Sequence, residues 1–130
     1  MSDIAVDTSA IVESMLEGPR GEWIDEMVAA ADVVLVTPVA RVEAAMVMIG
    51  RFGWDRAVFD RYWQDLAMHE VPIDSSMGKL AVDAFELWGK GRARARLNFG
   101  DCFSYALAKA RNLPLLCVGN DFRQTDLQTL

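Results

Sequence analysis

The chain is 130 residues long and 52% hydrophobic, which predicts a single domain over residues 1–130 that can bury its own core. No apolar run reaches the roughly 18 residues of a membrane helix, and the N-terminal region lacks the basic and apolar segments of a signal peptide. The formal net charge of −6 argues against a protein that binds nucleic acid over its whole surface.

The first third of the chain predicts two strands separated by two helices. A short apolar strand at residues 4–6 ends at Asp7, after which Thr8 or Ser9 can cap a helix. The unbroken, largely β-branched run at residues 33–36 is typical of a strand that is buried on both faces of a parallel sheet. Between these strands we expect helices over residues 10–17 and 22–31.

The middle of the chain continues the alternation of strands and helices. Thr37 and Pro38 mark a helix N-terminus, and Glu43 falls roughly one turn inside the helix that follows. We expect helices over residues 39–50 and 53–68, a weaker strand over 68–71, and a helix from Ser75 or Ser76 to Trp88, which Gly89-Lys90-Gly91 ends.

The last helix has a well-marked start. Asn98 is a good N-cap residue, and Asp101 stands three positions later, where its carboxylate can accept from the backbone N–H of the cap. Taken alone, Asp101 is best explained as half of a capping box. Asn112 and Pro114 end the helix before a short apolar strand over residues 115–118. The predicted apolar face comprises Phe103, Ala106, Leu107 and Ala110.

This order of elements indicates an α/β fold with a parallel sheet, right-handed crossovers and helices on both faces. No internal repeat, low-complexity tract or linker interrupts the chain, so we place no domain boundary. Cys102 and Cys117 have no paired spacing, so we interpret them as buried thiols of a cytoplasmic protein. His69 is the only histidine, so we expect no zinc site.

Basic residues concentrate in one segment of this acidic chain. Residues 1–89 contain 16 acidic and 6 basic residues, whereas residues 90–111 contain six basic residues against Asp101 alone. A local basic run on an acidic protein favours contact with phosphates, although a solvated basic loop would show the same pattern. The run that precedes the last helix contains Arg92, Arg94 and Arg96.

Several acidic residues fall where the strands of the predicted sheet end. Asp7 follows the first strand, Glu43 lies in the helix after the second, and Asp121 follows the last. Asp101 stands at the start of the helix that precedes the last strand, so its position in the sequence is weaker evidence that it lies at the same edge. Ligands of open α/β sheets bind at the carboxyl ends of the strands, so we expect these acids to converge there.

Converging carboxylates favour a metal ion. Two carboxylates about 4 Å apart repel by ~4 kcal/mol at an effective dielectric constant of about 20, so such a cluster must protonate, spread apart or bind a cation. Oxygen ligands without histidine or cysteine select a hard cation, Mg²⁺ or Mn²⁺, over zinc.

Other acidic, nucleotide and nucleophile sites fit the sequence less well. Asp7 lacks the second aspartate at position +2 that aspartyl-phosphate phosphatases require. No P-loop or Gly-x-Gly-x-x-Gly sequence is present, and no serine stands in a nucleophile elbow.

Four sequence blocks are specific enough to indicate a family. They are VDTSA at residues 6–10, Glu43 after VTP, LNFGDCFSYALAK at 97–109 and GNDFRQTDL at 119–127. These blocks resemble PIN-domain ribonucleases and, more narrowly, the VapC toxins of VapBC toxin–antitoxin systems. The resemblance runs the full length of the chain. It implies a PIN-domain-like three-layer α/β/α sandwich with a mainly parallel central sheet of four or five strands.

The resemblance also implies a metal-binding carboxylate cluster that hydrolyses RNA phosphodiester bonds. Asp126 stays open as a further ligand. The chain departs from the family before Asn98, where relatives often have a His-Pro step and this chain has Arg94-Ala95-Arg96, so its substrate preference can differ. The residues that match the family's catalytic and metal-binding acids are Asp7, Asp101, Glu43 and Asp121.

Two protein partners follow from the same resemblance. One is a VapB-type antitoxin whose C-terminal segment covers the site, and the other is a second copy of the chain in a homodimer. The helix from Trp54 to Trp63 and the preceding Met46, Met48 and Ile49 are candidates for those surfaces, and an ordinary place in the core explains them equally well.

The working hypothesis is a Mg²⁺-dependent endoribonuclease that acts as the toxin of a type II toxin–antitoxin system, with Mn²⁺ able to replace Mg²⁺. Thr8 and Asn98 are expected to orient the carboxylates, and the three arginines to contact flanking phosphates without reading the RNA sequence. The alternative is a non-catalytic PIN-like module that regulates a partner through its acidic face. Loss of one of the four acids would favour it, and none is missing.

Overall fold

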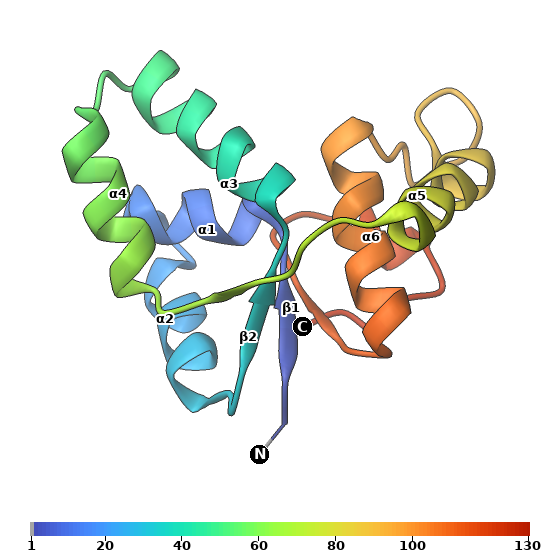
Figure 1. Ribbon diagram of the computed structural model, residues 1–130, viewed down its shortest axis with the longest axis horizontal. Coiled ribbons are helices and arrows are strands. Elements are labelled where there is room, and N and C mark those ends of the chain that lie inside the picture. The colour runs from blue at the N-terminus through green and yellow to red at the C-terminus, as the bar shows by residue number, and fades with distance from the viewer. Residues whose placement is uncertain (1) are drawn as a thin grey trace.

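Four short strands form a parallel sheet through the middle of the molecule, in the spatial order β3-β2-β1-β4 (Figure 1). The computed structural model describes residues 2–130. Each strand pairs with its neighbour in parallel, so the predicted parallel sheet is confirmed. The strands are β1 (Ile4–Val6), β2 (Val34–Val36), β3 (His69–Glu70) and β4 (Leu115–Leu116).

Helices connect the strands and cover both faces of the sheet (Figure 1). Four of them, α1 to α4, lie on one face, and α5 and α6 lie on the other, which gives the predicted three layers. The α-helices are α1 (Thr8–Met15), α2 (Gly21–Ala30), α3 (Pro38–Ala45), α4 (Arg56–Asp65), α5 (Ser75–Trp88) and α6 (Phe99–Arg111). The π-helical segment η1 (Met46–Arg51) continues α3, and the 3₁₀ turn η2 (Phe122–Gln124) follows β4.

The strands divide the core between these two layers because successive side chains point to opposite faces of a sheet. Ala5, Leu35 and Leu115 pack against α5 and α6, whereas Val6 and Leu116 pack against α1 to α4. All five side chains are at most 5% exposed. Strands of two or three residues suffice for β1, β2 and β4, because every residue of these strands is buried.

The C-terminal residues, which the sequence left unassigned, extend the sheet beyond β4. Leu115 N donates to Gln128 O at 2.9 Å, and Leu130 N donates to Leu115 O at 2.9 Å. Thr129 thus forms a parallel bridge with Leu115. Within residues 2–130 the sheet therefore has four strands, and this single bridge takes the place of a fifth.

Two predicted helices are shorter in the structure. The helix expected over residues 39–50 divides into α3 and η1, and the helix expected over 53–68 begins only at Arg56. Gly53 has a φ of +72°, a left-handed conformation that ends the preceding segment and delays the next helix.

The predicted apolar face of α6 is partly wrong. Ala106 and Leu107 are buried as expected, but Ala110 is exposed and Phe103 only partly buried. The reason is that α6 packs between the sheet and α5, so most of its circumference is covered. The additional buried side chains are Cys102, Ser104, Tyr105 and Ala108.

Three smaller expectations concern single residues and membrane segments. Cys102 and Cys117 are buried free thiols, as predicted. His69 lies exposed in the edge strand β3. No helix in residues 2–130 has both the length and the apolar character that crossing a membrane would require.

Candidate active site

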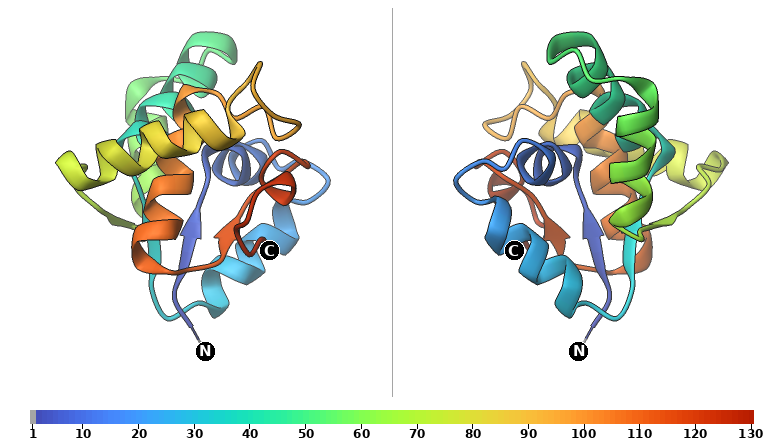
Figure 2. Two further views of the ribbon diagram at one scale, coloured as in Figure 1. Left: turned by 90° about the vertical axis from the view of Figure 1, so that its right-hand side faces the viewer. Right: turned by 90° about the vertical axis from the view of Figure 1, so that its left-hand side faces the viewer.

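Three helices begin at the carboxyl edge of the sheet, each with a side chain that caps its first turn. Asp7 caps α1 by accepting from Ser9 N at 3.0 Å, and Thr37 caps α3 by accepting from Ala40 N at 3.1 Å. Asn98 caps α6, whose N-terminus reaches the same edge because α6 runs back toward the start of β4 (Figures 1 and 2). The partial positive charges of three helix N-termini therefore favour negative charge at this edge.

Asp7 is the most deeply buried acid of the site. It directly follows β1, beside the point where the strand order reverses between β1 and β4, and it is 3% exposed. Its Oδ1 accepts from the Ser104 hydroxyl at 2.5 Å, and its Oδ2 accepts from Ser9 N. Sequence reasoning missed Ser104, and the only available signal was a serine within a helix that is otherwise apolar on that side.

Glu43 reaches from α3 into the space between α1 and α6. Its Oε1 accepts from the Thr8 hydroxyl at 2.7 Å. A Cβ at Gly100 would lie 2.1 Å from either carboxylate oxygen, so Glu43 packs directly on the glycine in the first turn of α6. Burial raises the pKa of Glu43, the Thr8 hydrogen bond opposes that rise, and the charge of Asp7 adds to it.

Asp101 forms the predicted capping box and also belongs to the acid cluster. Its backbone N–H donates to Asn98 Oδ1 at 2.9 Å, while its Oδ2 accepts from Asn98 N at 3.0 Å. Burial is the main cause that raises the pKa of Asp101 to about 7, and the charges of Asp7, Glu43 and Asp121 add to it. All three other acids therefore lie within electrostatic reach of Asp101.

The two acids after β4 differ in their surroundings. Asp121 is exposed at the start of η2, close enough for its charge to act on Asp101. Asp126 accepts from the Tyr105 hydroxyl at 2.7 Å and from Lys109 Nζ at 2.6 Å. Both Asp126 oxygens are thus engaged in holding the C-terminal segment on α6, and we leave Asp126 out of the candidate ligand set.

The donor chemistry of this cluster fits a hard cation. All its donors are carboxylate oxygens. Burial, with a smaller part from neighbouring acids, raises the pKa of Asp101 and Glu43, and a bound cation would offset this cost of ionisation. As the side chains stand, no three acidic, histidine or cysteine groups in residues 2–130 are close enough together to hold a metal ion.

The three arginines of the basic run occupy the loop between α5 and α6. Arg92 Nε donates to Glu86 O at 3.2 Å, and its guanidinium lies 5.4 Å from the centre of the Phe85 ring, so this side chain is held on α5. Arg94 and Arg96 are exposed, in alternation with the buried Ala95. The backbone pairing of residues 88–90 with Leu97 fixes the base of the loop.

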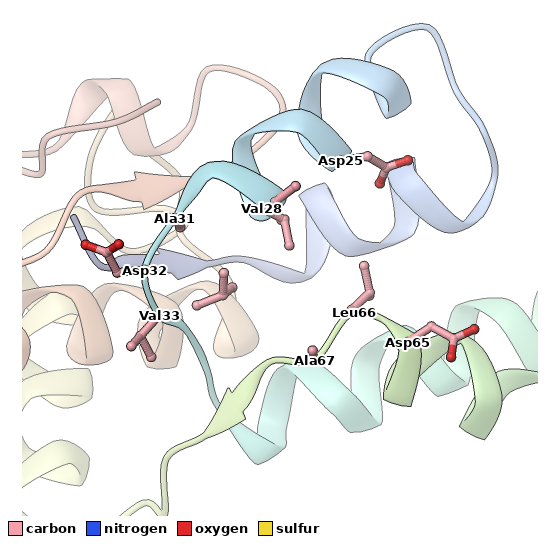
Figure 3. A pocket seen from close by; sticks show the side chains of 10 residues that line it. Asp25, Val28, Ala31, Asp32, Val33, Asp65, Leu66 and Ala67 are labelled. Atoms are coloured by element: carbon pink, nitrogen blue, oxygen red, sulfur yellow. The ribbon is translucent and has the colours of Figure 1, made fainter. Parts of the chain in front are cut away.

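A separate hollow of about 520 Å³ lies between α2 and the end of α4 (Figure 3). Val33 and Val34, at the amino end of β2, line this hollow, so it lies at the opposite edge of the sheet from Asp7. Asp25, Asp32 and Asp65 contribute its acidic groups. The candidate site is therefore defined by converging carboxylates at the carboxyl edge and not by this hollow.

Comparison with known proteins identifies the family. The family model of the PIN domain matches residues 4–127. The chain belongs to the PIN domain family. Named relatives within this family are VapC proteins. Ribonuclease VapC30 of Mycobacterium tuberculosis is 37% identical over 98% of both chains. A VapC ribonuclease of Rhizobium meliloti is 39% identical over 94% of this chain and 97% of the relative.

Solved PIN-domain structures share the fold. Mycobacterium tuberculosis VapC20, described as a sarcin–ricin-loop-cleaving toxin, superposes with a TM-score of 0.71 over 95% of both chains at 16% identity. VapBC2 from Rickettsia felis, bound to a promoter DNA fragment, gives a TM-score of 0.66 over 100% of this chain and 98% of the neighbour at 13% identity. At such identities the likeness shows the fold alone.

The first prediction concerns Asp101 and pH, measured with a chelator present. The folded-state pKa of about 7 exceeds the ordinary value of 3.8, so the folded protein binds an extra proton between these values. The free energy of unfolding should therefore fall as pH rises through this window. Above pH 7, Asp101→Asn should be more stable than wild type by about 1–2 kcal/mol, after allowance for solvent screening.

Urea denaturation at a series of pH values measures this difference. The stability advantage of Asp101→Asn should shrink steadily toward pH 4. The prediction is wrong if Asp101→Asn is less stable than wild type by the same amount at every pH. That result would mean that the contribution of the Asp101 cap to stability exceeds the cost of its buried charge.

The second prediction concerns the contact between Gly100 and Glu43. In Gly100→Ala the new methyl must displace the Glu43 carboxylate, which is the mobile end of its side chain, so the fold should persist. The displaced carboxylate becomes better solvated, and its pKa should fall toward the ordinary value. Gly78→Ala is the matched control, because Gly78 lies in α5 with open space around its Cα. NMR titration of Glu43 tests this, and an unchanged pKa in Gly100→Ala would contradict the placement of Glu43.

Proposed function

We propose that this PIN-domain chain is a Mg²⁺-dependent endoribonuclease that acts in the cytoplasm as the toxin of a type II toxin–antitoxin system. It hydrolyses RNA phosphodiester bonds and thereby arrests growth. The observation that carries the proposal is the convergence of acids at the N-terminal part of α6, where Glu43 packs on Gly100 and Asp7 accepts from Ser104, on either side of Asp101 in the sequence. The VapC ribonuclease names of relatives at 37–39% identity support RNA as the substrate.

Four carboxylates would hold the cation, namely those of Asp7, Glu43, Asp101 and Asp121. Mn²⁺ would substitute for Mg²⁺, because both prefer oxygen ligands. When bound, the cation would supply Lewis acidity toward water and toward a phosphate oxygen. The carboxylates would have to move closer together, and their attraction to the cation would offset the repulsion that this movement increases.

Other residues of this chain would hold the carboxylates in place. Thr8 fixes Glu43 through its hydroxyl, and Ser104 fixes Asp7. The backbone N–H of Asn98 fixes one oxygen of Asp101, which leaves the other oxygen for a ligand. These contacts would reduce the reorganisation that substrate binding requires.

The exposed guanidiniums of the α5–α6 loop would contact phosphates that flank the cleaved bond. Arg94 and Arg96 fit this role because both are exposed beside the N-terminus of α6. Such contacts position RNA without reading its sequence. Arg92 fits less well, since it is held on α5 by Glu86 O and Phe85.

The protein partner would be a VapB-type antitoxin that neutralises the site. Its inhibitory segment should present a basic group toward the carboxylates or an acidic group toward the arginines, together with apolar anchors. A groove of about 540 Å³ between α5 and α6 offers apolar side chains for such anchors, including Phe85, Phe99 and Phe103.

A homodimer would need an exposed apolar surface, and part of the predicted segments could supply it. Met48, Phe59 and Trp63 are buried in the core and cannot contribute to it. Of the predicted residues, Met46 is 68% exposed, Tyr62 44% and Val58 42%, so these side chains leave an exposed apolar surface. The other exposed apolar side chains near it and on α5 and α6 are Val42, Val82, Phe85, Leu87 and Phe99.

The alternative function, a non-catalytic PIN-like module, would act by stoichiometric binding through the acidic face. A binding module gains nothing from a set of complete, mutually repelling carboxylates fixed by dedicated donors. The presence of all four acids and of their hydrogen-bonding partners therefore favours the enzyme.

The third prediction separates enzyme from binding module. Purified wild-type protein should cut RNA with Mg²⁺ present, and its expression should arrest bacterial growth. Asp7→Asn and Asp101→Asn should lower the cleavage rate by about 100-fold or more and relieve the arrest, because each removes a cation ligand. Mapping of cleavage ends in total RNA after brief induction would identify the target.

Asp83→Asn is the matched control, since it removes one exposed carboxylate from α5, away from the site. It should be as active and as toxic as wild type, and all variants should remain equally soluble. The proposal fails if metal-loaded wild-type protein cuts no RNA and Asp101→Asn is as toxic as wild type.

A further inference from the structure

Arg20 is a cation held in a fixed position in the loop between α1 and α2. Gly18 N donates to Glu13 O at 3.0 Å, and Arg20 N donates to Glu13 Oε2 at 3.1 Å. A Cβ at Gly18 would lie 2.1 Å from Glu13 Oε1, so the loop closes around the Glu13 carboxylate. The Arg20 guanidinium lies 4.4 Å from the centre of the Trp23 ring, which covers one of its faces and leaves its edge N–H groups available.

Arg123 is an exposed cation on the 3₁₀ turn that follows β4. It stands two residues after Asp121, and its neighbour Phe122 anchors the turn with 3% exposure. Thr125 Oγ1 donates to Phe122 O at 2.6 Å, which closes the turn. Val118 N donates to the Ser9 hydroxyl at 3.0 Å and so ties the exit of β4 to the first turn of α1.

Both guanidiniums act on the Cys117 thiol, the residue that follows β4. Burial raises the pKa of Cys117 to about 11 and the charge of Asp7 adds to it, whereas the charges of Arg123 and Arg20 oppose it. Arg123 stands two residues after Asp121 in the turn that follows β4, and the hydrogen bond from Val118 N to Ser9 joins this end of β4 to α1, the helix that leads into the Arg20 loop. The ion pairs found in residues 2–130 use Arg41, Arg56 and Lys109, so no carboxylate neutralises either cation.

We propose that Arg20 and Arg123 bind backbone phosphates of the RNA substrate and extend the basic margin that begins at Arg94 and Arg96. The inference rests on the function proposed above. Figure 2 shows the α5–α6 loop, η2 and the α1–α2 loop on one side of the molecule, and Figure 1 shows the α5–α6 and α1–α2 loops toward opposite ends of that side. A polyanion that approaches an acid cluster is repelled by it, and cations along one margin offset that repulsion and define the path of the strand.

The geometry of Arg20 favours phosphate over a structural ion pair. A guanidinium stacked on an aromatic ring presents its N–H groups in a plane that matches two phosphate oxygens. Arg20→Lys keeps the charge but loses both the stacking and the paired donors, so it should bind RNA more weakly than wild type and more tightly than Arg20→Ala.

The test measures RNA binding by the full chain in the Asp101→Asn background, which prevents turnover. The probe is a fluorescently labelled single-stranded RNA of about 20 nucleotides, titrated with Mg²⁺ present between about 50 and 200 mM salt. Arg20→Ala and Arg123→Ala should each weaken binding several-fold and reduce the slope of log affinity against log salt by about 0.7, the value for one lost phosphate contact on a single strand. In the active background each should raise KM with little change in kcat.

Arg111→Ala is the matched control, because it removes an equal charge from the last turn of α6 at the far edge of the sheet. Its slope of log affinity against log salt should equal that of the Asp101→Asn protein. Unchanged slopes in Arg20→Ala and Arg123→Ala, with a reduced slope in Arg94→Ala, would overturn the inference and leave the proposed function standing. If the Asp101→Asn protein binds no RNA and the wild-type protein cleaves none, that result would instead count against the proposed function itself.

Discussion

The cost of burying carboxylates together at one edge of a parallel sheet is the constraint on which this structure depends. Asp7, Glu43 and Asp101 belong to three different helices or their caps, and folding brings their charges together in a largely buried space. The fold offsets part of the cost with three helix N-termini and with hydroxyl donors from Thr8 and Ser104. The raised pKa of Asp101, about 7, shows that the offset is incomplete. Buried carboxylates whose ionisation is costly favour binding of a cation, and this preference connects the fold to the proposed chemistry.

Sequence reasoning predicted the fold well, because the signals that define it are local. Three of the four strands, β1, β2 and β4, are short apolar runs, and caps such as Asn98 and the Thr37–Pro38 pair mark where helices begin. What it missed depends on packing at long range. The burial of Ser104 and the exposure of Ala110 follow from the position of α6 between the sheet and α5, and the pairing of Thr129 with Leu115 joins distant segments.

The acids of the site could be named from the sequence, but their surroundings could not. Asp101 looked like a capping residue, and the structure makes it a cap and a cluster member at once. No sequence rule indicates that Gly100 leaves room for the Glu43 carboxylate, since that contact joins residues 57 positions apart. The basic side chains were sought in one run before α6, whereas Arg20 and Arg123 are brought near Cys117 only by folding.

Cation binding by the carboxylate cluster is the central claim, and direct titration with Mn²⁺ tests it. Mn²⁺ is observed by paramagnetic resonance, so free and bound ions are counted without any assay of activity. Wild-type protein should bind Mn²⁺ saturably, and Mg²⁺ should compete with Mn²⁺ for the site. Asp7→Asn and Asp101→Asn should each weaken Mn²⁺ binding by about tenfold or more. Asp126→Asn should bind as wild type, since Lys109 and Tyr105 already occupy its carboxylate. Failure of the wild type to bind Mn²⁺, or equal affinity in all four proteins, would contradict the account.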